Sequence, residues 1–319
     1  MSWWVPKEVS ARARIQLGTM NFGKRTPASD SERIIHGAIE RGIDFFDTAN
    51  VYCDGESERI LGRALKGKRG ACTIATKVGF ARIDGKAEGL GRARILAACY
   101  ASLSRLGIDC IDLYYLHVPD HATPIEESLD ALSELLDKKK ISRWGVSNYA
   151  SWQILEMMHI ADARKMPRPV MSQQIYNVLI RQLEVEYFKF TRKFPIVTTV
   201  YNPLAGGLLT GKHACGASQK GSRFENNRLY QTRYWSEAMF DRTEELGAIA
   251  RDEGLALTDL AYAWLAGRPE VDAILVGPGT MEHLDSALAA CDQVLSPAVR
   301  QRIDDAYRNW QGTDVTYAR

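Results

Sequence analysis

Residues 111–147 read IDLYYLHVPDHATPIEESLDALSELLDKKKISRWGVS. The first seven residues form an apolar run that is typical of a buried β-strand. Residues 125–138 then repeat leucine at helical spacing, which predicts an amphipathic helix. A second apolar run, SRWGVS from Ser142, predicts another strand. Strand, helix and strand in this order indicate two parallel neighbours, because a parallel crossover is long enough to hold a helix.

Similar apolar runs recur along the chain, and helical segments separate them. Residues 31–41, for example, place Ile34, Ile35, Ala38 and Ile39 on one helical face. Regular alternation of strand and helix predicts a sheet of parallel strands. Eight segments have the character of strands: RIQL from Arg14, IDFFD from Ile43, CTIATK from Cys72, IDLYYLH from Ile111, SRWGVS from Ser142, VMSQQIYN from Val170, IVTTVYN from Ile196 and VDAILVG from Val271.

Two parallel architectures compete, an open doubly wound sheet and a closed barrel. Eight strand-helix units in 319 residues favour the α/β class with a (β/α)8 TIM barrel, which typically needs about 250 residues. The doubly wound fold lacks its fingerprint, since no G-x-G-x-x-G follows the first strand. We expect one barrel domain over residues 1–319, with a long loop from Leu204 to Ala238 after the seventh strand. This loop and the extension after Ser296 could both project over the C-terminal face of the barrel.

Composition narrows the range of partners. A net charge of +2, with acidic and basic residues interspersed, provides no basic stripe for nucleic acid. The six cysteines are scattered without a C-x-x-C pair, which is typical of reduced thiols. The longest uncharged run, 194–211, carries two prolines and three glycines, and residues 1–14 have no apolar signal-peptide core. We therefore expect a cytoplasmic protein without a membrane or nucleic-acid partner.

Polar residues mark the ends of three consecutive predicted strands. Asp47 ends the second strand, Lys77 the third and His117 the fourth, and Tyr52 lies just after Asp47. Each of them alone is more simply explained as a residue of a loop or surface. Because the carboxyl ends of barrel strands share one face, all four are expected to converge there.

The sequences around these residues resemble the aldo-keto reductase superfamily over nearly the whole chain. The resembling segments, in the order that the family keeps, are DTANVYCDGESERILGRAL from Asp47, ATK ending at Lys77, LYYLH ending at His117, GVSNY from Gly145, QIYN from Gln174 and YNPLAGGLLTGK from Tyr201. The resemblance implies a nicotinamide-dependent carbonyl reductase. It also implies that Tyr52 is the general acid, Lys77 lowers its pKa, Asp47 orients Lys77, and His117 hydrogen-bonds the substrate oxygen.

Physical chemistry explains why such a set is useful. A carbonyl oxygen gains negative charge during reduction, and a tyrosine with an ordinary pKa of about 10 releases its proton reluctantly. A lysine ammonium about 4 Å away favours the phenolate by up to about 4 kcal/mol at an effective dielectric constant of about 20. We therefore expect Lys77 to lower the pKa of Tyr52, with Asp47 keeping the lysine charged.

The resemblance also implies the cofactor contacts. Ser147, Asn148 and Gln173 correspond to residues that bind the nicotinamide carboxamide, Tyr201 stacks on the ring, and Arg223 approaches the phosphates. NADPH is the expected cofactor and NADH the alternative, because the segment from Gly277 offers fewer cations than relatives do. The further expected contacts are Gly18, Thr19, Met20, Asp47, Asn202, Pro203, Leu204, Gly206, Leu208, Gly211, Lys212, Gly277, Gly279, Thr280, His283 and Asp285.

Two other ligand sites can be set aside on sequence grounds. GGLLTGKH from Gly206 nearly spells a phosphate-binding P-loop, but His213 stands where a magnesium-binding hydroxyl is required. His117 and His121 lie in a loop around Pro119 with no third ligand in evidence, so we expect no zinc or other metal.

The insertion GSRFENNRLYQTRYWSEAMF from Gly221 resembles the branch that contains aflatoxin-aldehyde and succinic-semialdehyde reductases. That resemblance implies substrate contacts at His117, Tyr230, Arg233 and Arg319. Guanidinium groups would select an aldehyde that also carries a carboxylate, since they bind carboxylates through two parallel hydrogen bonds.

Three hypotheses follow. The first is NADPH-dependent reduction of small carboxylated or dicarbonyl aldehydes, and the second keeps this chemistry for sugars, pyridoxal or methylglyoxal. The third is a redox-sensing nicotinamide-binding subunit similar to channel β subunits, which share the fold and the four residues. A homodimer is expected by resemblance to the same branch.

Overall fold

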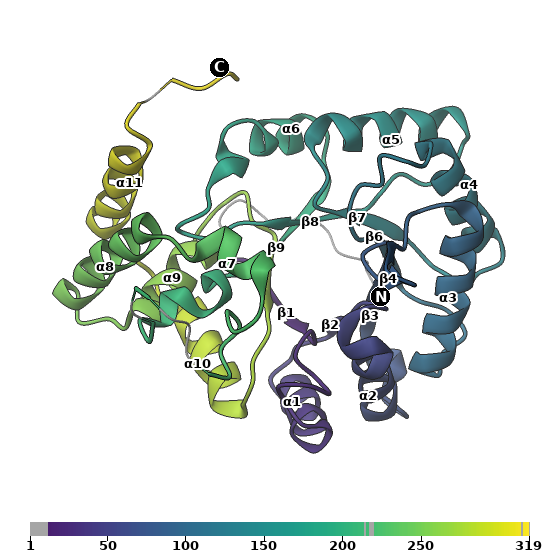
Figure 1. Cartoon of the computed structure of the whole chain (residues 1–319), viewed down its shortest axis with the longest axis horizontal. Coiled ribbons are helices and arrows are strands. Elements are labelled where there is room, and N and C mark those ends of the chain that lie inside the picture. Colours follow the sequence, from purple (N-terminus) through teal and green to yellow (C-terminus); the bar gives the residue numbers. More distant parts are fainter. Residues whose placement is uncertain (1–11, 214, 217–219, 314, 319) are drawn as a thin grey trace.

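The computed structural model describes residues 12–213, 215–216, 220–313 and 315–318. Its main sheet is a closed barrel of eight parallel strands in the spatial order β1, β10, β9, β8, β7, β6, β3, β2 (Figure 1). Every one of these strands overlaps one of the eight predicted segments, so the predicted TIM barrel is confirmed. The strands are β1(Arg14–Gly18), β2(Phe45–Asp47), β3(Thr73–Val78), β6(Leu113–Leu116), β7(Trp144–Ser147), β8(Met171–Ile175), β9(Val197–Tyr201) and β10(Ala273–Val276).

Helices cover the outside of the barrel (Figure 1). The segments predicted as helical at 31–41 and 125–138 correspond to α1(Ala28–Glu40) and α4(Ile125–Asp137). The remaining helices are α2(Glu56–Ala64), α3(Arg92–Leu106), α5(Ser151–Ala163), α6(Tyr187–Lys193), α7(Arg228–Tyr234), α8(Glu237–Asp252), α9(Leu257–Ala266), α10(Met281–Asp292) and α11(Pro297–Gln311), with short 3₁₀ turns η1(Tyr52–Gly55), η2(Arg69–Ala71), η3(Gln182–Glu184) and η4(Ala205–Thr210).

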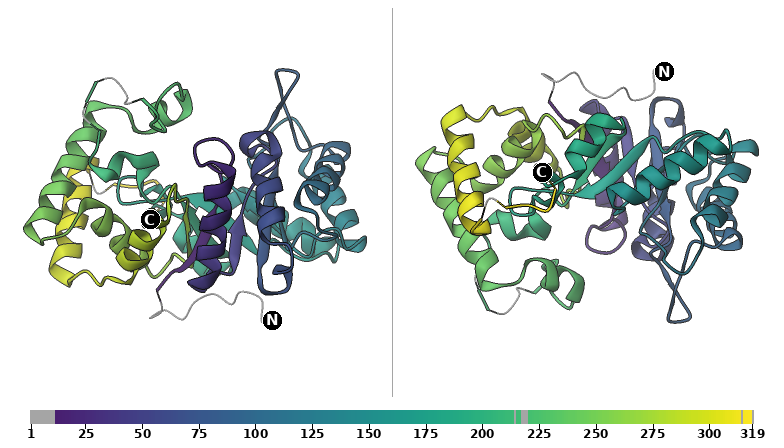
Figure 2. Two further views of the ribbon diagram at one scale, coloured as in Figure 1. Left: turned by 90° about the horizontal axis from the view of Figure 1, so that it is seen from below. Right: turned by 90° about the horizontal axis from the view of Figure 1, so that it is seen from above.

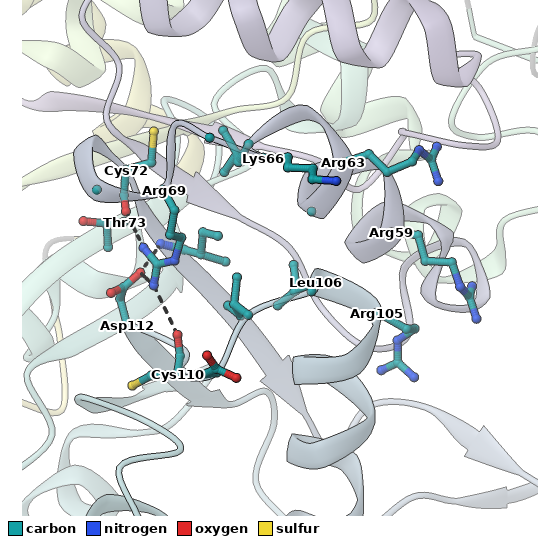
Figure 3. A pocket seen from close by; sticks show the side chains of 18 of the residues that line it. Arg59, Arg63, Lys66, Arg69, Cys72, Thr73, Arg105, Leu106, Cys110 and Asp112 are labelled. Atoms are coloured by element: carbon teal, nitrogen blue, oxygen red, sulfur yellow. Dashed lines mark hydrogen bonds and ion pairs between the residues drawn. The ribbon is translucent and has the colours of Figure 1, made fainter.

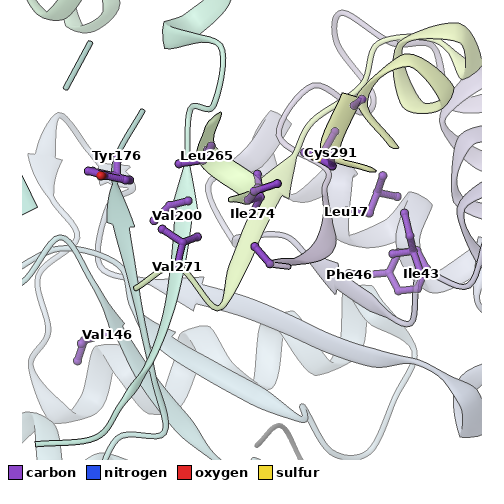
Figure 4. Close-up of a cluster of buried hydrophobic side chains, with 14 of the residues drawn as sticks. Leu17, Ile43, Phe46, Val146, Tyr176, Val200, Leu265, Val271, Ile274 and Cys291 are labelled. Carbon is purple, nitrogen blue, oxygen red and sulfur yellow. The ribbon is translucent and has the colours of Figure 1, made fainter. Parts of the chain in front are cut away.

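The core has two layers because side chains of a strand alternate between its faces. In β2, Phe45 belongs to the cluster inside the barrel. Phe46 belongs to the cluster between strands and helices, part of which Figure 4 shows. Both phenylalanines are fully buried, and each such burial stabilises the fold by about 1.5–3 kcal/mol. This filled interior leaves only the ends of the barrel open for binding.

A short antiparallel hairpin follows β3 and was not predicted. It consists of β4(Arg82–Ile83) and β5(Lys86–Ala87), joined through Asp84 and Gly85. Both turn residues have positive φ angles, 50° and 77°, as a two-residue type I′ hairpin turn requires. The hairpin and the segment that carries α7 project on the same side of the barrel (Figure 2).

The chain after Ser296 does not extend over the C-terminal face as expected. Helix α11 packs on α8, and its Asp304 pairs with the buried Arg181 at 2.8 Å. Beyond it, the carbonyl of Ala318 accepts a hydrogen bond from Lys189 of α6 (3.1 Å). The loop after β9 does lie over that face, and it contains η4 and α7 rather than irregular chain alone.

Candidate active site

A pocket of about 370 Å³ opens at the carboxyl ends of the barrel strands. It brings together most of the residues that the sequence singled out. The predicted residues that line it are Gly18, Thr19, Met20, Asp47, Tyr52, His117, Ser147, Asn148, Gln173, Tyr201, Asn202, Pro203, Leu204, Gly206, Arg223, Tyr230, Arg233 and Gly277.

A buried ion pair forms the base of this pocket. The Lys77 ammonium donates to the Asp47 carboxylate and to the Thr48 carbonyl (2.9 Å), and neither charged side chain is exposed. The second carboxylate oxygen of Asp47 accepts from the Gln173 amide (2.9 Å). Burial raises the pKa of Asp47 and lowers the pKa of Lys77, and the attraction between the two charges opposes both shifts.

The loop after β2 places Tyr52 over this pair. The ammonium of Lys77 lies 5.2 Å from the centre of the Tyr52 ring. The loop ends at Gly55, which has a φ of 83° and leads directly into α2. The hydroxyl of Ser57 at the start of α2 donates to the Thr19 carbonyl (2.9 Å) and lies 2.9 Å from the Thr48 hydroxyl. These bonds fasten the helix to the ends of β1 and β2, which fixes the position of the tyrosine.

The pKa of Tyr52 differs from the expectation. Burial raises it well above the ordinary tyrosine value, and the negative charge of Asp47 raises it further. The positive charge of Arg223 acts in the opposite direction. The pKa of Tyr52 is thus raised rather than lowered, and the contribution of Lys77 itself stays a prediction. Tyr52 is consequently a neutral phenol at physiological pH and keeps the proton that an acid must deliver.

His117 completes the group at the end of β6. It is 8% exposed, and its ring centre lies 5.9 Å from that of Tyr52. Burial, followed by the charge of Lys77, lowers the pKa of His117 well below the ordinary value, so the imidazole is neutral. Its Nδ1 atom is buried and has no hydrogen-bond partner in the described part of the chain. A neutral imidazole in this position can hydrogen-bond an uncharged oxygen.

The polar residues expected to hold a nicotinamide lie on the next strands around the barrel. The amide of Asn148 donates to the Ser147 hydroxyl (3.0 Å) and to the His117 carbonyl (3.0 Å). Its oxygen accepts from the Tyr201 hydroxyl at 2.5 Å. Asn148 has a φ of 65°, a left-handed conformation that asparagine tolerates better than most residues. Hydrogen bonds among Ser147, Asn148 and Tyr201 thus hold these side chains in place.

The loop after β9 is held against the β1–α1 loop. The guanidinium of Arg223 donates to the Asn21 side chain (2.9 Å) and to the Tyr230 hydroxyl (3.1 Å). Tyr230 in turn donates to the Asn202 side chain (3.2 Å). At Gly206 a Cβ atom would lie 2.6 Å from the Tyr230 ring, so only glycine lets the backbone approach this closely.

Several predicted contacts lie outside this pocket. Thr280 caps α10 by accepting from the His283 backbone N–H (3.2 Å), and Asp285 accepts from Arg41 (3.0 Å). Arg319 lies outside the described residues. The predicted cofactor contacts that do not line the pocket are Leu208, Gly211 and Lys212 in or after η4, and Gly279, Thr280, His283 and Asp285 at the start of α10.

The sequence reasoning missed some pocket residues. Phe80 and Leu229 are exposed apolar side chains, Tyr262 belongs to α9 and Leu275 belongs to β10. For Phe80 a signal exists: it lies three residues after Lys77, in a loop that leads to the Asp84-Gly85 hairpin turn. The other three carry no signal that separates them from core residues.

A larger cavity of about 1460 Å³ lies at the opposite, amino-terminal end of the barrel strands (Figure 3). Many cations line it, but several have structural partners. Arg69 donates to the carbonyls of Cys72 (2.7 Å) and Cys110 (3.1 Å) and pairs with Asp112 (2.6 Å). Arg105 pairs with the buried Glu58 (2.5 Å). Its size alone therefore does not make this cavity the active site.

The smaller pocket has the features of a TIM-barrel enzyme, with a tyrosine, an ion pair and an imidazole together at the C-terminal face. Comparison with known proteins identifies the family. The model of the Aldo/keto reductase family matches residues 14–308, and the chain belongs to this family. It is therefore a nicotinamide-dependent oxidoreductase.

Individual relatives cover most of the chain. It is 35% identical to aflatoxin B1 aldehyde reductase member 2 of Rattus norvegicus, over 95% of this chain and 87% of the relative. It is 33% identical to aldo-keto reductase family 7 member A3 of Homo sapiens, over 93% and 94%. It is also 32% identical to a probable voltage-gated potassium channel subunit beta of Arabidopsis thaliana, over 91% of both chains.

The described residues contain no group of three or more His, Cys, Asp or Glu side chains arranged to hold a metal ion. In the same residues, no helix combines the length and the apolar character needed to cross a membrane.

Proposed function

We propose that this protein reduces aldehydes to alcohols with NADPH, and that Tyr52 is the general acid. The observation that carries the proposal is the arrangement of Tyr52 over the buried Asp47–Lys77 pair, next to a neutral His117. The four residues come from three neighbouring strand ends or the loops that follow them, and all except Lys77 line the pocket.

The pocket offers groups that suit the nicotinamide end of a dinucleotide. Gly18 and Gly277 present bare backbone at the ends of β1 and β10, and a Cβ at Gly18 would lie only 3.1 Å from Leu275. Asn148 and Gln173 provide the amides that a carboxamide requires, and Tyr201 provides an aromatic face. NADPH, when bound, supplies the hydride that the carbonyl carbon accepts.

The protein's own residues then act on the carbonyl oxygen. His117 donates a hydrogen bond that orients this oxygen, and Tyr52 releases its proton to it. The raised pKa of Tyr52 opposes this proton transfer. The ammonium of Lys77 favours it, because its positive charge stabilises the phenolate that remains. Asp47 keeps the ammonium in place throughout.

We propose a substrate that also carries a carboxylate, such as succinic semialdehyde. Arg233 of α7 and Arg223 of the same loop both line the pocket, so two guanidinium groups border it. Arg223 is engaged by Asn21 and Tyr230, whereas Arg233 lies beside the Tyr201 hydroxyl inside the pocket, so Arg233 is the first choice for the carboxylate. Arg319 stays a predicted substrate contact.

The test is the rate of NADPH oxidation by the purified protein with succinic semialdehyde. Tyr52→Phe should lower the turnover at least a hundredfold while the protein still binds NADPH, since general acid catalysis typically contributes about 10²–10⁴. Arg233→Ala should lower the activity toward acidic aldehydes and spare uncharged aldehydes. Equal activity of the native protein and Tyr52→Phe would refute the assignment of the acid. Repeating the assay with NADH decides the cofactor preference.

A second candidate is a nicotinamide-binding regulatory subunit. Its support is the similarity to the Arabidopsis relative, whose name is that of a channel subunit. This function predicts a tight NADPH complex with negligible turnover of any aldehyde tried. The homodimer, the cytoplasmic location and the organisation of residues 1–319 as one domain stay predictions, and light scattering of the purified protein tests the first.

A further inference from the structure

A buried carboxylate lies outside the pocket, on the neighbouring helix α2. Glu58 is fully buried, and it does not line the pocket. One of its oxygens accepts from the Thr76 hydroxyl (2.6 Å), and the other accepts from the Arg105 guanidinium of α3 (2.5 Å). A carboxylate is costly to bury unless it is paired and hydrogen-bonded. The stability of this arrangement therefore depends closely on where its two partners lie.

The hydroxyl of Thr76 connects Glu58 to the strand that carries the buried lysine. Thr76 directly precedes Lys77 in β3, and successive side chains of a strand point to opposite faces. Lys77 pairs with Asp47 at the base of the pocket, whereas Thr76 bonds to Glu58 on α2. Burial lowers the pKa of Lys77, and the negative charges of Asp47 and Glu58 both raise it. Glu58 thus acts on the lysine through its charge and through the backbone of β3.

Arg105 connects the same carboxylate to the turn of Tyr52. A Cβ atom on Gly55 would lie 2.6 Å from the Cδ atom of Arg105 and 2.8 Å from its Nε atom, so the arginine packs directly on bare glycine backbone. Gly55 has a φ of 83° and ends the η1 turn, which begins at Tyr52. The guanidinium of Arg105 also donates to the Ser102 hydroxyl (3.1 Å). The pairing of Arg105 with Glu58 therefore supports the turn from behind.

We propose that Glu58 and Arg105 are positioning residues for the proposed reduction. The pair is bonded to β3 on one side and packed on the η1 turn on the other, so it fixes the Lys77 ammonium relative to the Tyr52 ring. The stabilisation of a phenolate by an ammonium falls as the distance between them grows. Loss of the pair therefore lowers kcat and leaves substrate binding intact. The proposal rests on the proposed aldehyde reduction, but not on the carboxylate contact at Arg233.

The experiment follows NADPH oxidation with succinic semialdehyde in variants of the pair. Arg105→Met should lower kcat about tenfold and change KM and the Kd for NADPH less than about twofold, because only the alignment of the acid is disturbed. Arg105→Lys keeps a positive charge beside Glu58 and should restore kcat to within about threefold of the native value. The double variant Glu58→Gln with Arg105→Met removes both charges, so it folds without an uncompensated buried carboxylate and should lose kcat like Arg105→Met.

A matched control and a readout without turnover complete the design. Arg63→Met also removes an arginine that pairs with a glutamate of α2, but this arginine is exposed and bonds to neither β3 nor η1, so kcat should stay unchanged. The NMR signal of the Tyr52 Cζ carbon is assigned by its absence from Tyr52→Phe in protein with labelled tyrosine. It should shift in Arg105→Met and in the double variant, and should not shift in Arg63→Met.

An unchanged kcat in Arg105→Met and in the double variant would overturn the proposal. A loss of kcat in the double variant together with weaker NADPH binding and a lower urea midpoint would overturn it too, since that pattern shows a purely structural role. If the native protein reduces no aldehyde, the proposed function fails and the Tyr52 signal alone decides. A shift confined to the variants of the pair then supports the positioning of Tyr52, and an unchanged signal refutes it.

Discussion

Replacement of Lys77 by methionine tests the ion pair at the base of the pocket. Methionine fills nearly the same volume, so the variant removes the positive charge without leaving a large cavity. The carboxylate of Asp47 then stays buried with Gln173 as its remaining polar contact. Breaking a buried pair by removing one partner costs about 3–5 kcal/mol, because an uncompensated charge remains. This is a large part of the total stability of a typical protein, about 5–15 kcal/mol.

The measurement is urea unfolding followed by tryptophan fluorescence at several pH values. Burial already raises the pKa of Asp47, and loss of Lys77 raises it further. A carboxyl whose folded-state pKa lies above its unfolded value takes up a proton on folding, so its contribution to stability is lost as the pH rises. The deficit of Lys77→Met should therefore be largest at pH 8 and should shrink as the pH falls toward 5. Lys138→Met, at an exposed lysine paired with Glu134, should leave the midpoint unchanged.

A pH-independent deficit would show that Asp47 does not titrate in the variant. A deficit below about 1 kcal/mol at pH 8 would show that the pocket rehydrates the carboxylate, and would refute the argument from burial.

Two further predictions follow from the same coordinates. Gly62→Ala should destabilise the protein by about 1–3 kcal/mol, because its Cβ would lie 2.3 Å from the Leu106 carbonyl oxygen. Gly70→Ala is the control and should leave the urea midpoint nearly unchanged, since a Cβ there would have no atom within 4 Å. Similar urea midpoints for the two variants would contradict this prediction. Burial holds the pKa of His117 well below the ordinary value of about 6.5, so the rate of NADPH oxidation should show no inflection near pH 6.5. The unfolded chain takes up a proton at His117 below pH 6.5 and the folded protein does not, so the stability of the protein should fall as the pH falls below 6.5. An inflection near pH 6.5 that His117→Gln removes would show that the imidazole is exposed to solvent in the working enzyme.

The sequence predicted the barrel because its strands are continuous apolar runs. Strands covered on both faces must be apolar along their whole length, as LYYL in β6 and AILV in β10 are. The four candidate catalytic residues could be expected together for a topological reason, since parallel strands bring their carboxyl ends to one face. The side chains proposed to bind the cofactor were predictable only through the family resemblance.

Other features depend on what surrounds a residue, which a single sequence does not state. The raised pKa of Tyr52 follows from its burial and from the nearby negative charge of Asp47. The path of the chain after Ser296 follows from the pairing of Asp304 with the buried Arg181. The hairpin after β3 could have been predicted from the sequence, because Asp-Gly is a strong signal for a two-residue hairpin turn.

The carboxylate of Asp47 connects the residues around Tyr52 with those proposed to bind the nicotinamide, since it accepts hydrogen bonds from Lys77 and from Gln173. Substitutions at these three positions should therefore be strongly epistatic, as is usual for residues in one hydrogen-bond network. A change at Gln173 that alters cofactor preference would also alter the acid, and its effect in an evolving lineage would depend on which residue occupied position 47 or 77 at the time. Directed evolution of the cofactor site should consequently vary the three positions together rather than one after another.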